Sequence, residues 1–352
     1  MSQYTVKAAA KLSREEVVDF LARIYGPNYH EARRVFECVF DHEPSILPQN
    51  FLMARDKRGV LIGLVRIVDR EVLIGGICLR CGVISSVAVH PSWRGQGVCS
   101  RLMRAALDNM RVRKFAVSTL HARKVLDGFY AQFGYYGIGR YVELDVEWKD
   151  VPAGKGLSVR AMTLKDIPVC RRLRDRLYTG LAGSYVRDAA HWAFVLKRSA
   201  SGGSTTSWQV IVDKAGVIGY LVRDGGRLVE LCLDEKHFTL LSGLLCRESV
   251  SVIKVHPRHP FFLYCRRSFN TSFRERFALD GGYMGRIIDA DVFWQAFKPL
   301  LPEEHLLSAD TAKEWGCSPA DIRALLGVEA ASGAFAACFP DRGFYTSPID
   351  EF

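Results

Sequence analysis

The stretch "VAVHPSWRGQGVCSRLM", residues 87–103, places the strongest constraint on the fold of this chain. It begins with small and β-branched apolar residues typical of a strand, and passes through Pro91 into a loop with Arg94, Gly95 and Gly97. Apolar side chains at helical spacing follow, so the stretch predicts a strand, a basic glycine-containing loop and a helix in succession. Because the first N–H groups of a helix are unpaired and carry partial positive charge, this junction predicts an anion site in an α/β fold.

The glycine spacing of this loop argues against two common phosphate-binding patterns. The segment 94–100 does not contain GxGxxG, which a dinucleotide-binding loop requires. It also lacks the GxxxxGK followed by Ser or Thr that defines a P-loop. The loop therefore predicts a phosphate-bearing ligand that is held by another type of α/β fold.

The predicted elements occur twice in the same order along the chain. Helices open the first unit, where Ser13 and Glu16 have the spacing of a capping box, and a run of strands over residues 50–89 follows. A helix, a strand, a second helix and a last strand over 139–148 are expected to complete this unit. After a linker that contains Pro and Gly, over 149–158, the second unit repeats the order without a basic glycine loop.

We therefore expect an α/β (α+β) protein with two related units, each a mixed sheet flanked by helices, and a small C-terminal cap. The expected bounds are 1–150 for the first domain, 151–282 for the second and 283–352 for the cap. A length of 352 residues agrees with this division, since one domain usually has about 100–200 residues.

Composition and charge limit the partners of the chain. No run approaches the roughly 18–20 apolar residues of a membrane span, and the N-terminus has no apolar core of signal-peptide length, which together predict a cytoplasmic protein without a membrane partner. The net charge of +10 is compatible with nucleic acid, but Lys and Arg are mixed with Asp and Glu throughout. This mixture makes nucleic acid the less favoured partner, and a solvated basic surface that attracts phosphorylated small molecules fits the charge as well. The sequence is compatible with a homo-oligomer but does not predict the oligomeric state.

The cysteines and histidines do not predict a metal site. Cys78 and Cys81 form a CxxC, but no second CxxC or CxxH supplies further ligands at the usual spacing. His256 and His259 enclose a proline and cannot share the face of a regular helix. We expect strand-borne or buried thiols and no metal.

The loop and a motif downstream of it resemble the GNAT acetyltransferases. The loop matches that family's acetyl-CoA pattern at Arg94 and Gly97 and departs from it at Cys99, where a small residue is usual. About thirty residues later, the segment 129–135, "FYAQFGY", is similar to the family's "FYxxxGF" signature. The resemblance implies that Tyr130 acts as general acid to the leaving thiolate of acetyl-CoA. It implies that the cofactor-binding residues are Val87, Ala88, Val89, Arg94, Gly95, Gln96, Gly97, Val98, Cys99 and Ser100.

The general base is harder to identify from the sequence. In many GNAT enzymes a carboxylate precedes the loop, but the strand over 84–89 has no acid. The layout of two GNAT-like units and a cap is similar to the enhanced-intracellular-survival (Eis-like) acetyltransferases, with a shortened C-terminal domain. In that group the C-terminal carboxylate serves as base, which implies this role for Phe352. The alternative is a frayed acidic terminus.

We predict an acetyl-CoA-dependent N-acetyltransferase that moves an acetyl group directly to a primary amine of a small molecule or peptide. Two alternatives stay open: a catalytically silent acyl-CoA-binding regulatory protein and a nucleic-acid-binding protein. Cys99 as an acyl-enzyme nucleophile is disfavoured, because the loop is expected to lie far from the thioester. The identity of the amine and the acyl-chain preference are not predicted.

Overall fold

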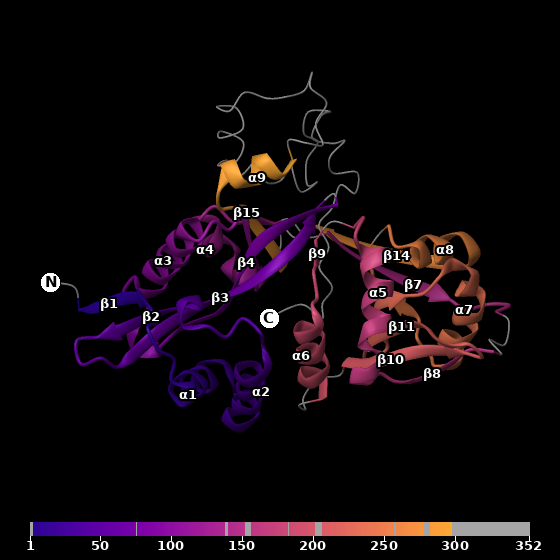
Figure 1. Ribbon diagram of the computed structural model, residues 1–352, viewed down its shortest axis with the longest axis horizontal. Helices are drawn as coiled ribbons and strands as arrows, with labels where there is room; N and C mark the ends of the chain where they lie inside the picture. Colours follow the sequence, from indigo (N-terminus) through magenta and orange to yellow (C-terminus); the bar gives the residue numbers. More distant parts are fainter. Residues whose placement is uncertain are drawn as a thin grey trace, which may run out of the picture.

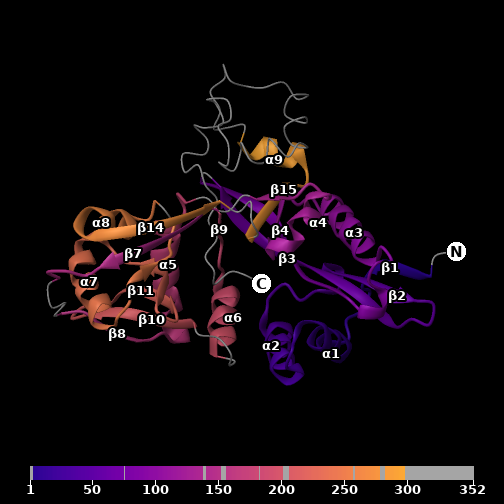
Figure 2. The same cartoon turned by 180° about the vertical axis from the view of Figure 1, so that it is seen from behind.

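The computed structural model describes residues 3–74, 76–137, 140–151, 156–181, 183–200, 206–256, 258–277 and 282–297. Within these residues the strands form two mixed sheets, one of eight strands and one of seven. Figure 1 shows the two sheets side by side, each with its own helices, and Figure 2 shows the same arrangement from behind. The predicted fold class, mixed sheets flanked by helices, is confirmed.

The first sheet has the strand order β1-β2-β3-β4-β5-β15-β6, and β9 pairs with β3. Strands β4 and β5 run parallel, and the other pairings are antiparallel. The bounds are β1 Tyr4–Ala8, β2 Phe51–Asp56, β3 Leu61–Ile74, β4 Ile77–Val89, β5 Val117–Ala122, β6 Tyr136–Gly137, β9 Ser184–Tyr185 and β15 Gly282–Ile287.

Among the described residues the first sheet is accompanied by helices α1 Arg14–Tyr25, α2 Tyr29–His42, α3 Val98–Val112 and α4 Asp127–Ala131, and α9 Ala290–Phe297 also contacts β4. The predicted helix start is confirmed, because the Ser13 hydroxyl accepts a hydrogen bond from the Glu16 N–H. Helix α3 packs on the sheet through an apolar face of buried residues, which includes Leu102, Met103 and Ala106. This packing fixes the N-terminus of α3 at the end of β4.

The second sheet has the order β14-β7-β13-β12-β11-β10-β8. Its bounds are β7 Arg140–Glu147, β8 Ser158–Ala161, β10 Thr206–Asp213, β11 Gly216–Asp224, β12 Arg227–Cys232, β13 Val252–Ile253 and β14 Asn270–Phe277. The helices of this part are α5 Ile167–Tyr178, α6 Ala189–Ala200, α7 Phe238–Arg247 and α8 Pro260–Ser268, and α9 Ala290–Phe297 follows β15.

The strands are exchanged between the two parts in a way that the sequence analysis did not predict. Strand β7 was expected to complete the first sheet, but it pairs with β13 and β14 in the second sheet. Strand β15, which was expected in the C-terminal cap, pairs with β5 and β6 of the first sheet. Hydrophobic alternation indicates that a segment forms a strand, but it does not indicate which sheet the strand joins. The sheet that contains β7 and the sheet that contains β15 were therefore decided by tertiary pairing.

The second half also reaches into the first through β9. Its residues Ser184 and Tyr185 pair with Leu73 and Val72 of β3, and the Tyr185 hydroxyl lies 2.6 Å from the Thr119 hydroxyl of β5. Helix α6 lies between the two sheets beside α2 (Figures 1 and 2). These contacts join the two sheets at the side of β3 and β5.

No helix among the described residues has the length and apolar character that crossing a bilayer requires.

Candidate active site

The candidate site begins where two parallel strands of the first sheet separate. Strands β4 and β5 pair from Cys81 with Val117 to Ile84 with Leu120, and this pairing ends there. Just beyond, two residues of β4, Ser86 and Val87, lie opposite one residue of β3, and Ser86 has φ of +51°. Such a bulge bends a strand and redirects its following residues. The end of β4 therefore turns away from β5 and opens a gap between them.

The loop after β4 has the geometry of an anion-binding junction. A short 3-10 turn, Pro91–Trp93, precedes Arg94, and helix α3 begins at Val98 with Gly97 as its N-cap. Gly95 and Gly97 have φ of +75° and +74°, a region that L-residues rarely adopt. A Cβ at Gly95 would meet nothing within 4 Å. The loop thus leaves free space in front of the unpaired N–H groups of α3.

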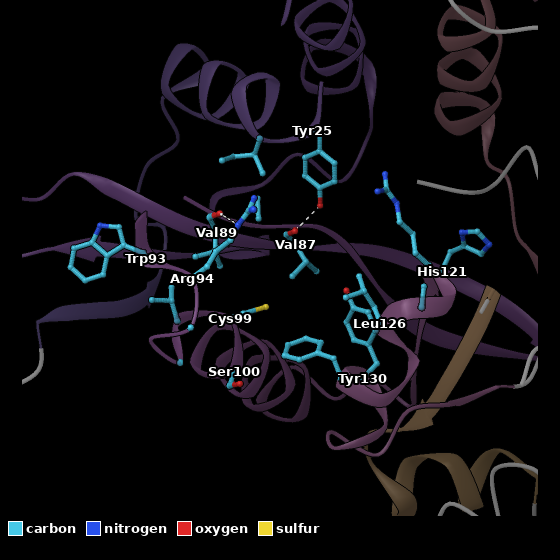
Figure 3. Close-up of a pocket in the computed structure, with 18 residues that line it drawn as sticks. Tyr25, Val87, Val89, Trp93, Arg94, Cys99, Ser100, His121, Leu126 and Tyr130 are labelled. Atoms are coloured by element: carbon cyan, nitrogen blue, oxygen red, sulfur yellow. Dashed lines mark hydrogen bonds between the residues drawn. The ribbon is translucent and has the colours of Figure 1, made fainter. Parts of the chain in front are cut away.

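A cavity of about 890 Å³ fills the gap and extends along this loop (Figure 3). Trp93, Arg94 and Ser100 lie at one end of it in Figure 3, and His121, Leu126 and Tyr130 lie toward the other. The cavity is lined by Ile24, Tyr25, Val87, Ala88, Val89, Trp93, Arg94, Gly95, Gly97, Val98, Cys99, Ser100, His121, Ala122, Arg123, Leu126, Phe129 and Tyr130.

Nine of the ten residues predicted to bind the cofactor line this cavity. The exception is Gln96, whose side-chain amide donates to the Ser92 carbonyl at 2.9 Å and whose own carbonyl accepts from the Tyr4 hydroxyl at 3.4 Å. The Gln96 side chain is therefore used in a hydrogen bond within the loop and does not line the cavity. Phe352, the predicted base, lies outside the described residues.

Tyr130 lies in the short helix α4 and is 7% exposed. Its ring packs against Phe129 and Tyr135, with centroids 5.2 Å and 6.4 Å away. Burial raises its pKa well above the usual value of a tyrosine, and the nearby Cys99 and Tyr25 side chains add to the rise. Tyr130 is therefore protonated at neutral pH, as a proton donor must be.

Cys99 projects into the same cavity between β4 and α4 (Figure 3). Burial raises the pKa of its thiol to about 11, even though it stands in the first turn of α3. The thiol is near enough to Tyr130 to add to the pKa rise of that residue, so Cys99 is closer to the predicted acid than the sequence suggested. A thiol that stays protonated is a poor nucleophile, which also disfavours an acyl-enzyme at Cys99.

Helix α1 brings a second tyrosine to the site. Tyr25 is the last residue of α1, and its hydroxyl donates to the Val87 carbonyl at 2.7 Å (Figure 3). The ring is 41% exposed and contacts Phe36 of α2 at a centroid distance of 5.7 Å. Burial of its hydroxyl end raises the pKa of Tyr25 to about 12, the Cys99 thiol adds to this, and the Arg123 guanidinium opposes it. Tyr25 is therefore neutral, and its hydroxyl donates the hydrogen bond that contacts the end of β4 beyond the bulge.

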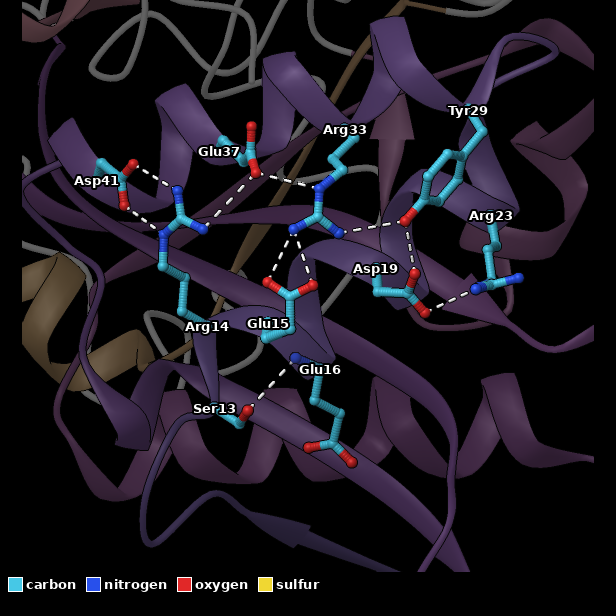
Figure 4. Close-up of polar contacts among 10 residues, drawn as sticks. All are labelled: Ser13, Arg14, Glu15, Glu16, Asp19, Arg23, Tyr29, Arg33, Glu37 and Asp41. Atoms are coloured by element: carbon cyan, nitrogen blue, oxygen red, sulfur yellow. Dashed lines mark hydrogen bonds and ion pairs between the residues drawn. The ribbon is translucent and has the colours of Figure 1, made fainter.

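Ion pairs join helices α1 and α2 (Figure 4). Arg33 of α2 binds both oxygens of Glu15 at 2.7 and 2.8 Å, and Arg14 binds both oxygens of Asp41 at 2.6 and 2.7 Å. None of the fourteen residues of α2, all of them described, is buried. Side-chain pairing thus supplements apolar packing in fixing the helix pair that carries Tyr25.

The CxxC pair does not form a shared ligand set. Cys78 and Cys81 lie on opposite faces of β4, Cys78 exposed and Cys81 buried, because an odd separation in a strand changes face. The Cys81 thiol lies 3.5 Å from the Thr119 hydroxyl, and burial raises its pKa to about 12. Among the described residues there is no group of three or more His, Cys, Asp and Glu side chains arranged to hold a metal ion.

Several lining residues were not singled out by the sequence analysis. Tyr25 ends an ordinary amphipathic helix, His121 lies in an ordinary strand and Arg123 follows that strand, so no local pattern distinguishes them. They reach the site because α1 and β5 end at the gap beside β4. Their position at the site therefore follows from the strand order of the sheet and not from the local sequence.

Comparisons with known proteins agree with the fold and the loop. Residues 5–138 match the family model described as the acetyltransferase (GNAT) domain. A segment of 77 residues, 22% of this chain, is 34% identical to the aminoglycoside 2'-N-acetyltransferase of Mycolicibacterium fortuitum. The match spans only 39% of the length of that relative.

Solved structures resemble the chain over most of its length. A GCN5-related N-acetyltransferase from Anabaena variabilis matches with a TM-score of 0.63 and 16% identity, over 82% of this chain and 74% of its own. A conserved protein from Enterococcus faecalis matches with a TM-score of 0.62 and 19% identity, over 84% and 75%. Eis1 from Mycobacterium abscessus matches with a TM-score of 0.57 and 15% identity, over 83% and 75%.

The cavity lies within the segment that matches this family model. Residues 5–138 match the GNAT acetyltransferase domain, and the fold of the described residues is similar to those of these solved structures over most of the chain. The resemblance to the Eis-like acetyltransferases that the sequence predicted is confirmed at the level of the fold.

Proposed function

We propose that this protein is an acetyl-CoA-dependent N-acetyltransferase, which moves an acetyl group to a primary amine by direct transfer in a ternary complex. The observation that carries the proposal is a single cavity that contains both the Arg94–Ser100 loop and the Tyr130 side chain. A cofactor-binding loop and a proton donor must lie in one cavity for the thioester to react there.

The residues of the loop fit an acyl-CoA. The N–H groups of 95–100 lie at and just before the N-terminus of α3, and the space beside Gly95, where a Cβ would meet nothing within 4 Å, is open to a pyrophosphate. The guanidinium of Arg94 adds a positive charge on the same side. In this proposal the backbone of Val87–Val89, unpaired with β5, holds the pantetheine arm. When bound, acetyl-CoA supplies an activated acetyl thioester.

Tyr130 is the general acid of the proposal. A tyrosine is protonated at neutral pH, and burial favours this neutral form of Tyr130, so its hydroxyl carries a proton that it can give to the departing sulfur. Among the described residues no group hydrogen-bonds this hydroxyl, which leaves it available to a ligand.

The proposed base is the terminal carboxylate of Phe352. The end of β4, Ser85–Val89, contains no acid, and no carboxylate is found among the described lining residues. The proton of the attacking amine must still be accepted, and the resemblance to the Eis-like proteins suggests the chain terminus.

Release of CoA with a panel of primary amines tests the proposal in wild type and Tyr130→Phe. We expect wild-type turnover with at least one amine and a fall in kcat of about 100-fold in the variant, because general acid catalysis usually contributes that much. Tyr264→Phe, which removes a hydroxyl from α8 in the second half, is the matched control and should change nothing. Binding of acetyl-CoA without turnover by any amine would support a silent binding protein.

Deletion of Phe352 tests the base separately. Lost turnover with intact acetyl-CoA affinity supports the terminal carboxylate, and unchanged turnover eliminates it.

A further inference from the structure

The charges around the cavity restrict the acceptor amine. The described lining residues include two arginines, Arg94 and Arg123, and one histidine, His121, but no aspartate or glutamate. One arginine suits the phosphates of the cofactor, as proposed above. Arg123 is not explained by phosphate binding at the loop, because it follows strand β5 and does not belong to the loop before α3.

Arg94 and Arg123 belong to opposite sides of the site. Arg94 stands in the loop before α3, where its Nε donates to the Val89 carbonyl at 3.4 Å. Arg123 follows directly after β5, and its charge acts on the hydroxyl of Tyr25 at the end of α1. His121, two residues before Arg123, lies far along the cavity from Trp93 and Arg94 and toward the end that holds Tyr130 (Figure 3).

The Arg123 side chain is exposed and makes no ion pair or hydrogen bond within the described part of the chain. Other arginines nearby have carboxylate partners: Arg80 of β4 binds Asp69 at 2.7 Å, and Arg113 at the C-terminus of α3 lies 3.3 Å from the same carboxylate. A guanidinium that lines a cavity and lacks a carboxylate partner can bind an anionic group of a ligand through charged hydrogen bonds.

We propose, on the basis of the function proposed above, that Arg123 and His121 form an acceptor subsite that selects amines carrying a carboxylate or phosphate group. The amine of such an acceptor reaches the Tyr130 end of the cavity while its anionic group contacts the guanidinium. A polycationic acceptor is disfavoured, since its several ammonium groups would face Arg94 and Arg123, while the described lining residues include no aspartate or glutamate and the proposed Phe352 base would supply a single carboxylate. The relative from Mycolicibacterium fortuitum acts on aminoglycosides according to its name, so the two proteins differ in acceptor under this proposal.

Matched pairs of amines test the subsite. O-phosphoethanolamine is compared with ethanolamine, β-alanine with β-alaninamide, and the aminoglycoside tobramycin serves as the polycation. We expect kcat/KM in wild type to be at least about 10-fold higher for the anionic member of each pair, and to be lowest for tobramycin, because a charged hydrogen bond contributes that much.

Arg123→Ala is expected to abolish this preference, with a loss of about 10- to 100-fold for the anionic amines and little change for the neutral ones. The KM for acetyl-CoA should stay the same. Arg104→Ala, which removes an equal charge from an exposed position of α3 outside the cavity lining, is the control and should leave the preference intact.

Equal turnover of neutral, cationic and anionic amines by wild type would overturn the proposal. So would a raised KM for acetyl-CoA with an unchanged preference in Arg123→Ala, since Arg123 would then serve the cofactor.

A binding measurement separates this proposal from the function on which it rests. Calorimetric titration of O-phosphoethanolamine into protein saturated with CoA should give binding in wild type and none in Arg123→Ala. If no amine releases CoA from acetyl-CoA, the proposed function fails, and the titration still decides the subsite. Absence of binding in wild type would overturn the subsite in either case.

Discussion

Each of the two sheets contains one parallel strand pair among its described strands, and the ends of these pairs are occupied differently. In the first sheet the parallel strands β4 and β5 separate after Ile84, and a cavity of about 890 Å³ occupies the gap. In the second sheet the parallel strands β12 and β13 pair only at Arg227 with Val252 and Leu228 with Ile253, and then separate in the same way. The backbone geometry alone therefore does not create a binding site.

Side chains fill the gap of the second sheet. His259, fully buried, has its Nε2 2.9 Å from the Leu231 carbonyl of β12, and its Nδ1 accepts from the Phe261 N–H at 3.1 Å. The Tyr178 hydroxyl reaches the same carbonyl at 3.5 Å. The end of β12 thus has partners inside the protein, whereas the end of β4 is held by Tyr25 from one side of an open cavity.

The turns that follow the two strands differ in charge as well as in shape. The turn after β4 has Arg94 and two glycines with positive φ, and the turn after β12 has Asp234 and Glu235 and continues into helix α7. Two acids at a helix N-terminus complement its partial charge internally, whereas the glycines leave that charge for a ligand. The comparison teaches that a few side chains decide which of two related junctions can bind an anion.

The largest expected effect concerns the acid of the second junction. Glu230 of β12 is fully buried, binds Arg187 at 2.7 and 2.8 Å and accepts from the Tyr220 hydroxyl at 2.6 Å. Glu230→Ala should lower the free energy of unfolding by about 3–5 kcal/mol, because it leaves buried arginines without their counter-charge. Urea unfolding measures the change, and exposed Glu235→Ala is the control, expected within about 0.5 kcal/mol of wild type. A small loss in Glu230→Ala would mean that this carboxylate is not structural.

A change in the first junction should affect the ligand and not the fold. Gly97→Val should raise the KM for acetyl-CoA by about 100-fold, because a branched side chain at φ of +74° distorts the loop and covers its N–H groups. Steady-state kinetics measures KM. Gly226→Val, in a turn of the second sheet where a Cβ meets nothing within 4 Å, should leave KM unchanged. An unaltered KM in Gly97→Val would show that the open junction is not the cofactor site.

His259, the buried histidine near the end of β12, should make the free energy of unfolding depend on pH. Burial lowers the pKa of His259 to about 4, against the usual value near 6.5, while its bond to the Leu231 carbonyl opposes the shift. The unfolded chain therefore binds more protons between these values, so stability is complete above about pH 6.5 and falls toward pH 4, by at most about 1.4 kcal/mol per pH unit from this group.

Urea unfolding at pH 7, 6 and 5 measures that slope. His259→Gln, whose amide can donate to Leu231 and accept from Phe261 without titrating, should flatten it. An equal slope in the variant would assign the pH dependence to other groups.

The smallest expected effect concerns the hydrogen bond that holds the open junction. Tyr25→Phe removes the donor to the Val87 carbonyl and should lower kcat/KM by about 3- to 10-fold, which corresponds to the usual contribution of one hydrogen bond. Steady-state kinetics with a saturating amine gives the value. Activity equal to wild type would mean that the bulge of β4 keeps its shape without Tyr25.

Much of the site could be predicted from local sequence. The residues from Arg94 to Ser100 combine glycines, a charge and a helix start within seven positions, and Tyr130 lies in a motif only some thirty residues away. Such features are set by neighbouring residues, so a single sequence reveals them. His259 was noticed only as part of a weak histidine pair, and its burial at Leu231 depends on contacts between distant segments.

The sequence by itself determined the class of fold, the position of the loop, the start of helix α1 and the absence of an acid on β4. Only the tertiary structure decided that β7 and β15 exchange sheets, that Tyr25 and Arg123 face the cavity, and that the second junction is filled. The reason is physical: hydrogen bonding and periodicity act over a few residues, whereas the choice of strand partner and the filling of a gap depend on packing across the whole molecule.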